Sequence, residues 1–210
     1  MAKKGLRRGI FITFEGPEGC GKSTQSSLLY DFLKKRGKRC IYTREPGGTK
    51  TGEMIRKVLL NSKGIKISNL AETLLFEASR AQIVSEVIKP ALLAGKIVIC
   101  DRYSDSTLCY QGYGGKVPVK DIESIDRIST GGLKPDLTIL LDIDTVTGLK
   151  RARRKGVDRM EEKALAYHKR VRMGYLKLAG EDPKRIRLVK VRETIEGTQK
   201  IVRREVASVV

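Results

Sequence analysis

The 210-residue sequence has no tryptophan, a single histidine (His168) and only four cysteines. The cysteines, at positions 20, 40, 100 and 109, show no CxxC spacing, and no cysteine or carboxylate cluster accompanies His168, which excludes the usual zinc-binding patterns. We expect free thiols in a reducing compartment, hence a cytoplasmic protein, and a surface or packing role for His168. No apolar run comes near the ~20 residues of a membrane-spanning helix, so the sequence predicts a soluble, unprocessed protein without membrane contact.

Acidic residues are scarce relative to basic ones. The chain has 24 Asp and Glu against 43 Lys and Arg, a net charge of +19 that would attract any polyanion. A nucleotide-dependent nucleic-acid-binding protein is therefore one alternative. The basic residues are spread through helical segments, however, and neither an RGG-like tract nor a histidine-cysteine finger is present. We expect a solvated basic surface, with nucleic acid not the main ligand.

The length suits one domain spanning residues 1–210. Short apolar runs rich in β-branched residues alternate with segments of helical periodicity. This alternation predicts an α/β fold, a three-layer αβα sandwich around a parallel central sheet of five strands. The strands are expected at 9–15, 39–43, 97–100, 136–143 and 185–191. Helices are expected at 22–36, 53–60, 70–94, 145–155, 159–179 and 195–209, with loop and helices across 104–130.

The segment GPEGCGKS, residues 16–23, lies between the first expected strand and the first expected helix. Its glycines let the backbone curl so that successive N–H groups point at phosphate oxygens, as in P-loop NTPases. Lys22 can then reach the β- and γ-phosphates of ATP, Ser23 can ligate Mg²⁺, and Thr24 can donate from the first helical turn. Cys20 is interpreted as a small filler, with a reactive thiol as the alternative. The residues expected to contact ATP are Gly16, Pro17, Glu18, Gly19, Cys20, Gly21, Lys22, Ser23 and Thr24.

A triphosphate site does not by itself name a reaction, because ATPases, GTPases, kinases and motors share it. The chain has no NKxD guanine motif and is short for a motor. Polar groups recur on four further segments where a second ligand would lie. These segments are REPGGT (44–49), LLFEASRAQ (74–82), DRYSDS (101–106) and YQG (110–112).

Together with TGGLKPDLTILLD and RVRMGYLKLAGEDPKRI, these segments closely resemble the thymidylate kinases in order and spacing, from about residue 10 to residue 191. Members of that family transfer the γ-phosphoryl group of ATP to dTMP. The resemblance implies a Mg²⁺-dependent enzyme with direct in-line transfer, and a homodimer. A kinase for another nucleoside monophosphate or a deoxynucleoside is the alternative within enzymes.

The acceptor residues also follow from chemistry. A monophosphate needs fixed cations, and Arg44 and Arg102 suit that role, with surface ion pairs as the alternative. A flat base needs an aromatic face and an edge reader, and Phe76 and Arg80 lie at i, i+4 on one helix face. The resemblance implies that Phe76 stacks on thymine and that Arg80 bonds its carbonyl. The alternative for Phe76 is core packing.

Further roles come from the resemblance. Asp101, at the end of a buried strand, matches a residue that holds Mg²⁺ or its waters, with a helix cap or a partner for Arg102 as the alternative. Ser106 and Gln111 match residues near the base edge. Tyr110 matches one near the sugar, where a ring would clash with a 2′-hydroxyl. Glu18 matches an acid that contacts the acceptor.

The loop has Gly19, not an arginine, after Glu18. In such family members a lid supplies the catalytic cation, and residues 151–159 resemble that lid, one residue short. The expected cation is Arg153, which is also expected to contact ATP, followed by Arg159, with Arg151 and Lys155 as alternatives. Lys22, Arg102, Arg153 and Glu18 are therefore the predicted catalytic residues.

Overall fold

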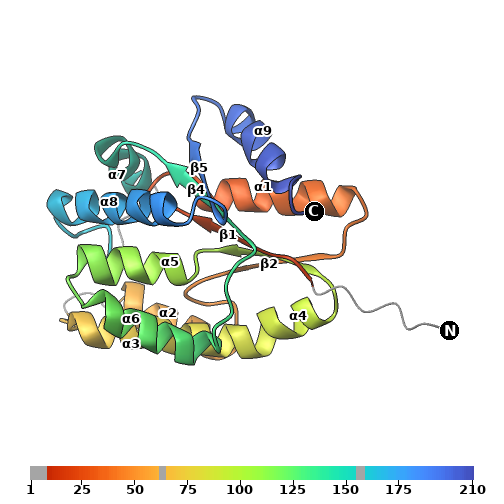
Figure 1. Cartoon of the computed structure of the whole chain (residues 1–210). Helices are drawn as coiled ribbons and strands as arrows, with labels where there is room; N and C mark the ends of the chain where they lie inside the picture. The colour runs from red at the N-terminus through yellow and green to blue at the C-terminus, as the bar shows by residue number, and fades with distance from the viewer. Residues whose placement is uncertain (1–8, 62–64, 155–158) are drawn as a thin grey trace.

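The computed structural model describes residues 9–61, 65–154 and 159–210. Five strands form one all-parallel sheet in the order β2-β3-β1-β4-β5 (Figure 1), which confirms the predicted α/β fold and the strand number. The strands are β1 (Phe11–Glu15), β2 (Cys40–Arg44), β3 (Ile97–Asp101), β4 (Leu137–Asp142) and β5 (Ile186–Lys190).

The central strands are apolar because helices cover both faces of a parallel sheet. Every residue of β1 and β3 is buried, including the two carboxylates that end them, Glu15 and Asp101. Phe14 of β1 pairs with Asp101 of β3, and Glu15 pairs with Leu140 of β4. This register brings the carboxyl ends of β1 and β3 to one edge of the sheet, where ligands bind in such folds.

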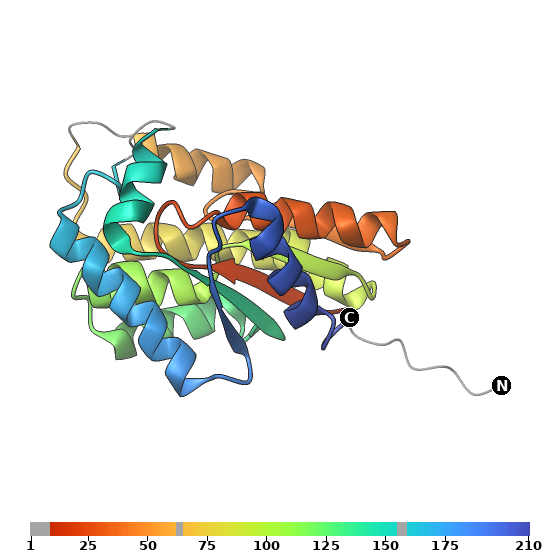
Figure 2. The ribbon, with the colours of Figure 1, turned by 90° about the horizontal axis from the view of Figure 1, so that it is seen from above.

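Helices form a layer on each face of the sheet (Figures 1 and 2). Helices α1 and α9 pack together on one face, and α3, α4 and α8 pack on the other. Among the described residues, none of the helices combines the length and the apolar character needed to cross a membrane. The helices are α1 (Lys22–Lys35), α2 (Lys50–Asn61), α3 (Asn69–Ile83), α4 (Lys89–Leu93), α5 (Ser104–Thr107), α6 (Val119–Thr130), α7 (Thr145–Arg153), α8 (Leu165–Glu181) and α9 (Ile195–Val206). Two π-helical segments, η1 (Val84–Ile88) and η2 (Leu108–Gly114), continue α3 and α5.

Most predicted boundaries are confirmed within three residues, but one helix start is wrong. The helix expected from residue 159 begins at Leu165. Arg159 instead lies in a turn, where its Nε atom donates to the backbone oxygen of Leu59 at 2.8 Å. A contact with a residue a hundred positions away leaves no trace in the local periodicity.

Candidate active site

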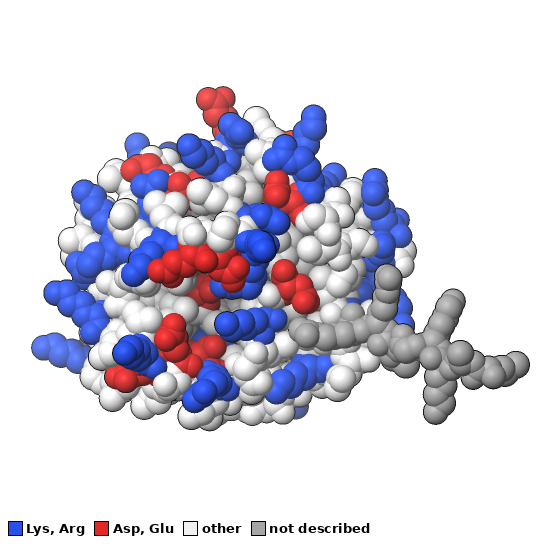
Figure 3. All heavy atoms as spheres, viewed as in Figure 1, with Lys and Arg blue, Asp and Glu red and all other residues white. Residues whose placement is uncertain are grey.

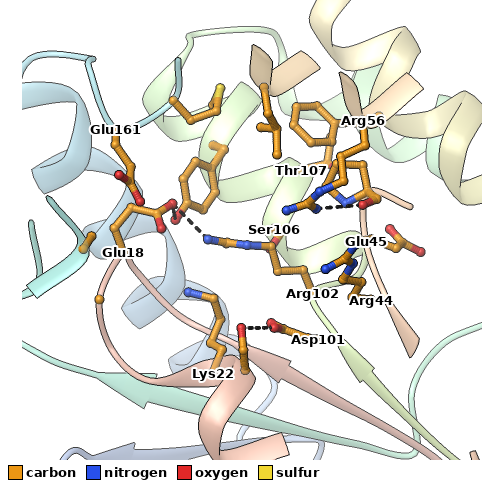
Figure 4. Close-up of a pocket in the computed structure, with 18 of the residues that line it drawn as sticks. Glu18, Lys22, Arg44, Glu45, Arg56, Asp101, Arg102, Ser106, Thr107 and Glu161 are labelled. Carbon is orange, nitrogen blue, oxygen red and sulfur yellow. Dashed lines mark hydrogen bonds and ion pairs between the residues drawn. The ribbon is translucent and has the colours of Figure 1, made fainter. Parts of the chain in front are cut away.

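A cleft of about 580 Å³ opens at the carboxyl edge of the sheet. The phosphate loop and α1 form one side, and segments that follow β2 and β3 form the others (Figure 4). It contains most of the predicted site residues. Those that line it are Glu18, Gly19, Gly21, Lys22, Ser23, Thr24, Arg44, Phe76, Arg80, Asp101, Arg102, Ser106, Tyr110 and Gln111. Gly16, Pro17, Cys20 and Arg153 are not among its lining residues.

The phosphate loop is tightly packed, and this packing requires glycine. Gly16 and Gly19 have φ angles of 140° and 67°. A Cβ atom on Gly16 would lie 2.2 Å from the backbone oxygen of Leu141, and one on Gly19 would lie 1.9 Å from that of Gly148 in α7. Conversely, a Cβ atom on Gly148 would lie 2.3 Å from the backbone oxygen of Glu18. The loop and the first turns of α7 are therefore in direct backbone contact.

The side chains of Lys22 and Cys20 are in contact, with Nζ of Lys22 3.5 Å from Sγ of Cys20. The Nζ atom of Lys22 donates to the backbone oxygens of Gly16 and Pro17, both at 2.9 Å, which holds the ammonium group at the loop. Cys20 lies in the apolar core between the sheet and α1. Burial raises the pKa of its thiol, which favours the filler interpretation over a reactive thiol.

Ser23 and Asp101 form an oxygen pair suited to a hard cation. The Oγ atom of Ser23 donates to Oδ2 of Asp101 at 2.5 Å. The other carboxylate oxygen, Oδ1, is buried without a hydrogen-bond partner, which is costly unless a cation or its water pairs with it. Within the described ranges, no cluster of three or more His, Cys, Asp or Glu residues could hold a metal. One hydroxyl and one carboxylate suit Mg²⁺, which takes its other ligands from water and phosphates.

Arg102 and Glu18 meet across the cleft (Figure 4). An Nη2 nitrogen of Arg102 lies 2.9 Å from Oε1 of Glu18, and the hydroxyl of Tyr110 donates to the same oxygen at 2.7 Å. Burial raises the pKa of Glu18, but the charges of Arg102 and Lys22 and the bond from Tyr110 outweigh it and lower that pKa to about 2. Glu18 is therefore an ionised hydrogen-bond acceptor at neutral pH.

The turn that carries Arg102 is held by a carboxylate that sequence analysis missed. Arg102 has φ 73°, an uncommon value for a residue with a side chain. Glu15 accepts from the backbone N–H of Tyr103 at 2.7 Å and from the hydroxyls of Ser106 at 2.6 Å and Tyr175 at 2.8 Å. Burial, followed by the charge of Asp105, raises the pKa of Glu15 to about 7. A carboxylate at the end of a mainly apolar strand was the available signal for Glu15.

Arg80 lies inside a carboxylate cluster. Its side chain is 2% exposed, and its guanidinium pairs with Glu45 at 2.9 Å, with Asp126 at 3.4 Å and with Glu77. Burial raises the pKa of Glu45 to about 8 despite the charge of Arg80. Phe76, one turn earlier, is half-buried and lines the cleft, which disfavours the core-packing alternative. These carboxylates fix the guanidinium at the cleft wall.

Arg44 and Gln111, the remaining residues predicted to contact the acceptor, both line the cleft. Arg44 is half-exposed and pairs with Glu53 at 3.3 Å, the surface ion pair that was its alternative interpretation, but it also lines the cleft. Arg56 of α2, which sequence analysis missed, lines the cleft and donates to the backbone oxygen of Pro46 at 2.8 Å. Gln111 donates through Nε2 to Glu72 at 2.9 Å.

The arginines predicted as lid cations have different surroundings in the structure. Arg151 lines the cleft, whereas Arg153 is an exposed residue at the end of α7. Arg159 pairs with Glu72 at 2.5 Å. Lys155 lies outside the described residues.

His168 is buried on α8 with its ring 5.3 Å from that of Tyr167, which agrees with a packing role.

A glycine loop at the carboxyl edge of a parallel sheet, next to a second subsite lined by arginines and an aromatic ring, defines a P-loop nucleoside monophosphate kinase. The thymidylate kinase family model matches residues 14–202. The thymidylate kinase of Roseiflexus sp. strain RS-1 is 48% identical over 89% of this chain and 88% of its own length. That of Dehalococcoides mccartyi is 52% identical over 84% and 85%. The crystal structure of thymidylate kinase from Ehrlichia chaffeensis superposes with a TM-score of 0.79 at 32% identity, covering 95% of this chain and 99% of the other. The chain belongs to the thymidylate kinase family.

Proposed function

We propose that this protein transfers the γ-phosphoryl group of ATP to dTMP, giving ADP and dTDP. The observation that carries the proposal is that one cleft joins the phosphate loop with Lys22 to an acceptor wall with Phe76 and Arg80. Phosphoryl transfer depends mainly on positioning and charge stabilisation, which the loop, Lys22 and Arg102 supply. Glu18, held ionised, is suited to accept a hydrogen bond from the acceptor nucleotide and unsuited to act as a general acid.

The test is ADP release with Mg²⁺-ATP and a panel of dTMP, dUMP, dCMP, dGMP and AMP. We expect dTMP to give the highest kcat/KM. A better acceptor within the panel would favour the alternative nucleotide kinase. No turnover with any acceptor would contradict a kinase, and tight, salt-sensitive DNA binding would then favour the nucleic-acid alternative. Lys and Arg are spread over the face in Figure 3 with Asp and Glu between them, which supports a solvated surface.

Mg²⁺ would be held by Ser23 and Asp101, and when bound it neutralises charge on the phosphates. We expect Asp101→Asn to raise the Mg²⁺ concentration for half-maximal rate about tenfold, because the amide removes the charge beside the phosphates. A Mg²⁺ titration at saturating ATP and dTMP measures this. Asp121→Asn, on the exposed first turn of α6, is the matched control. An unchanged Mg²⁺ requirement in Asp101→Asn would remove Asp101 from the metal site.

We assign roles in binding dTMP to residues that line the cleft. Phe76 would stack on the base while Arg80 and Gln111 read its edge, and Tyr110 would exclude a 2′-hydroxyl. Arg44 and Arg102 would bind the phosphate of dTMP. Ser106 is already bonded to Glu15 and Tyr175, so we assign it to the floor below the base, next to Arg102, with which its hydroxyl bonds at 3.3 Å.

Arg153 is proposed as the catalytic cation, with Arg151 as the alternative. We expect Arg153→Ala to lower kcat about 10²-fold and to raise the dTMP KM much less, because the cation acts on charge in the transition state. Arg151→Ala, two residues earlier on the same helix and at a position that lines the cleft, is the matched comparison. If only Arg151→Ala lowers kcat, the cation is Arg151.

A homodimer is proposed through α2 and α3. Met54 and Val58 on α2 are 69% and 46% exposed, and Leu70 and Leu74 on α3 are 53% and 48% exposed, while the two helices pack against each other. Large apolar side chains at i, i+4 on neighbouring helices favour a protein interface. Light scattering after gel filtration should give twice the chain mass of 23.4 kDa. A monomer at micromolar concentration would contradict the proposal.

A further inference from the structure

Glu72 is a buried carboxylate outside the cleft that connects several of its walls. It lies in the first turn of α3 and is 1% exposed. Its Oε1 atom accepts from Nε2 of Gln111 at 2.9 Å and from Nζ of Lys163 at 3.1 Å, and its Oε2 atom lies 2.5 Å from Nη2 of Arg159. Gln111 belongs to η2, and Arg159 and Lys163 flank the cleft residue Met160.

The charges around Glu72 keep it ionised. Burial alone would raise its pKa, but the hydrogen bond from Gln111 and the charges of Lys163 and Arg159 outweigh burial and hold that pKa below its ordinary value. The ammonium of Lys163 also lies 4.6 Å from the centre of the Tyr167 ring. Glu72 is therefore a fixed acceptor with no proton to donate.

The ionised carboxylate of Glu72 determines which end of the Gln111 amide faces it. A side-chain amide has an NH₂ end that donates and an oxygen end that accepts, and an ionised carboxylate pairs only with the first. With its nitrogen bonded to Glu72, Gln111 has its amide oxygen left to accept a hydrogen bond from a ligand in the cleft that the residue lines. The amide of Gln111 cannot exchange the positions of its nitrogen and oxygen without placing the oxygen against the carboxylate of Glu72, so the oxygen stays available to accept a hydrogen bond.

We propose that Glu72 is a positioning residue that sets base specificity by holding Gln111 in this orientation; the inference rests on the proposed function. Thymine and uracil carry an N–H donor at N3, whereas cytosine carries an acceptor there. An amide oxygen at the cleft pairs with the first two bases and opposes the third. Specificity against cytosine thus depends on a carboxylate that does not line the cleft.

Glu72→Gln tests this, because a neutral amide of the same shape pairs with either end of Gln111. We expect the ratio of kcat/KM for dTMP to that for dCMP to fall about tenfold, the value of one hydrogen bond. The ratio for dTMP to dUMP should stay within about twofold, because both bases present the same edge and a bond common to both cancels. The dTMP KM should rise while the ATP KM changes little, since the described partners of Glu72 are Gln111, Arg159 and Lys163 and none of these belongs to the phosphate loop.

Lys163→Met is the matched control, because it removes a partner of Glu72 but keeps the carboxylate on Gln111. Both ratios should equal those of the unmodified protein. If Glu72→Gln does not fold because two cations lose their partner, the double variant Glu72→Gln/Lys163→Met, which removes one of those cations, carries the same test. A dTMP to dCMP ratio unchanged in the folded variant would overturn the inference, as would an equal change in both ratios, the mark of a general structural defect. Absence of dTMP turnover in the unmodified protein would instead contradict the proposed function.

Discussion

Replacing Lys22 by methionine is expected to lower kcat about 10³-fold, because one charge aimed at the transferring phosphoryl group is worth that much in a closed site. Lys22 is buried, and its Nζ atom is held at the phosphate loop by the backbone oxygens of Gly16 and Pro17. Methionine keeps most of the length of the side chain and removes both the charge and the donors. Initial rates at saturating Mg²⁺-ATP and dTMP measure the loss.

The same substitution at Lys35, exposed in the last turn of the same helix, is the control. Lys35→Met should leave kcat within about twofold of the unmodified value, because an exposed charge far from the loop is screened by solvent. If Lys22→Met retained more than a tenth of the activity, the loop would bind ATP without stabilising the transferred group.

Arg102→Met is expected to lower kcat/KM for dTMP about 10³-fold, since Arg102 lies where a cation can bind the acceptor phosphate and charge in the transition state. The matched control is Arg204→Met, which removes an exposed ion pair with Glu205 on α9. The control should leave kcat/KM unchanged within about twofold. Equal losses in both variants would contradict a specific role for Arg102.

The same variant also has a pH signature in stability. Burial raises the pKa of Glu18, but Arg102 and then Lys22 and Tyr110 lower it to about 2, below its ordinary value of 4.5. A depressed carboxyl pKa stabilises the fold above about pH 4.5 and loses that contribution as the pH falls toward 2. The free energy of unfolding should therefore drop by about 2 kcal/mol in Arg102→Met at pH 7, and by less as the pH approaches 2. Urea denaturation at several pH values measures the difference; a constant difference would show that Glu18 is not involved.

The local pattern of apolar and polar residues was sufficient to predict the α/β architecture and the phosphate loop. The loop could be predicted because strand, glycines, Lys22 and Ser23 are adjacent in sequence, and their chemistry does not depend on distant residues. The central strands could be predicted because buried parallel strands are predominantly apolar.

The supporting residues of the site could not be predicted in this way. Glu15, Glu45 and Glu72 act through partners that are distant in sequence: Tyr175 is 160 positions from Glu15, and Lys163 is 91 positions from Glu72. Arg80 could be placed on the face of Phe76 from helical spacing, but two of its three carboxylate partners, Glu45 and Asp126, come from other segments. Such networks arise from tertiary packing, which single-sequence periodicity does not record.

The contact between Gly19 and Gly148 fixes the start of α7 against the phosphate loop. Each glycine is blocked by the backbone on the other side, Gly19 by the oxygen of Gly148 and Gly148 by the oxygen of Glu18. A side chain added at either position would clash with backbone atoms, which cannot move aside by a change of rotamer as a side chain can. The two positions therefore cannot compensate for each other, and the start of the helix that carries Arg151 and Arg153 is held directly against the phosphate loop.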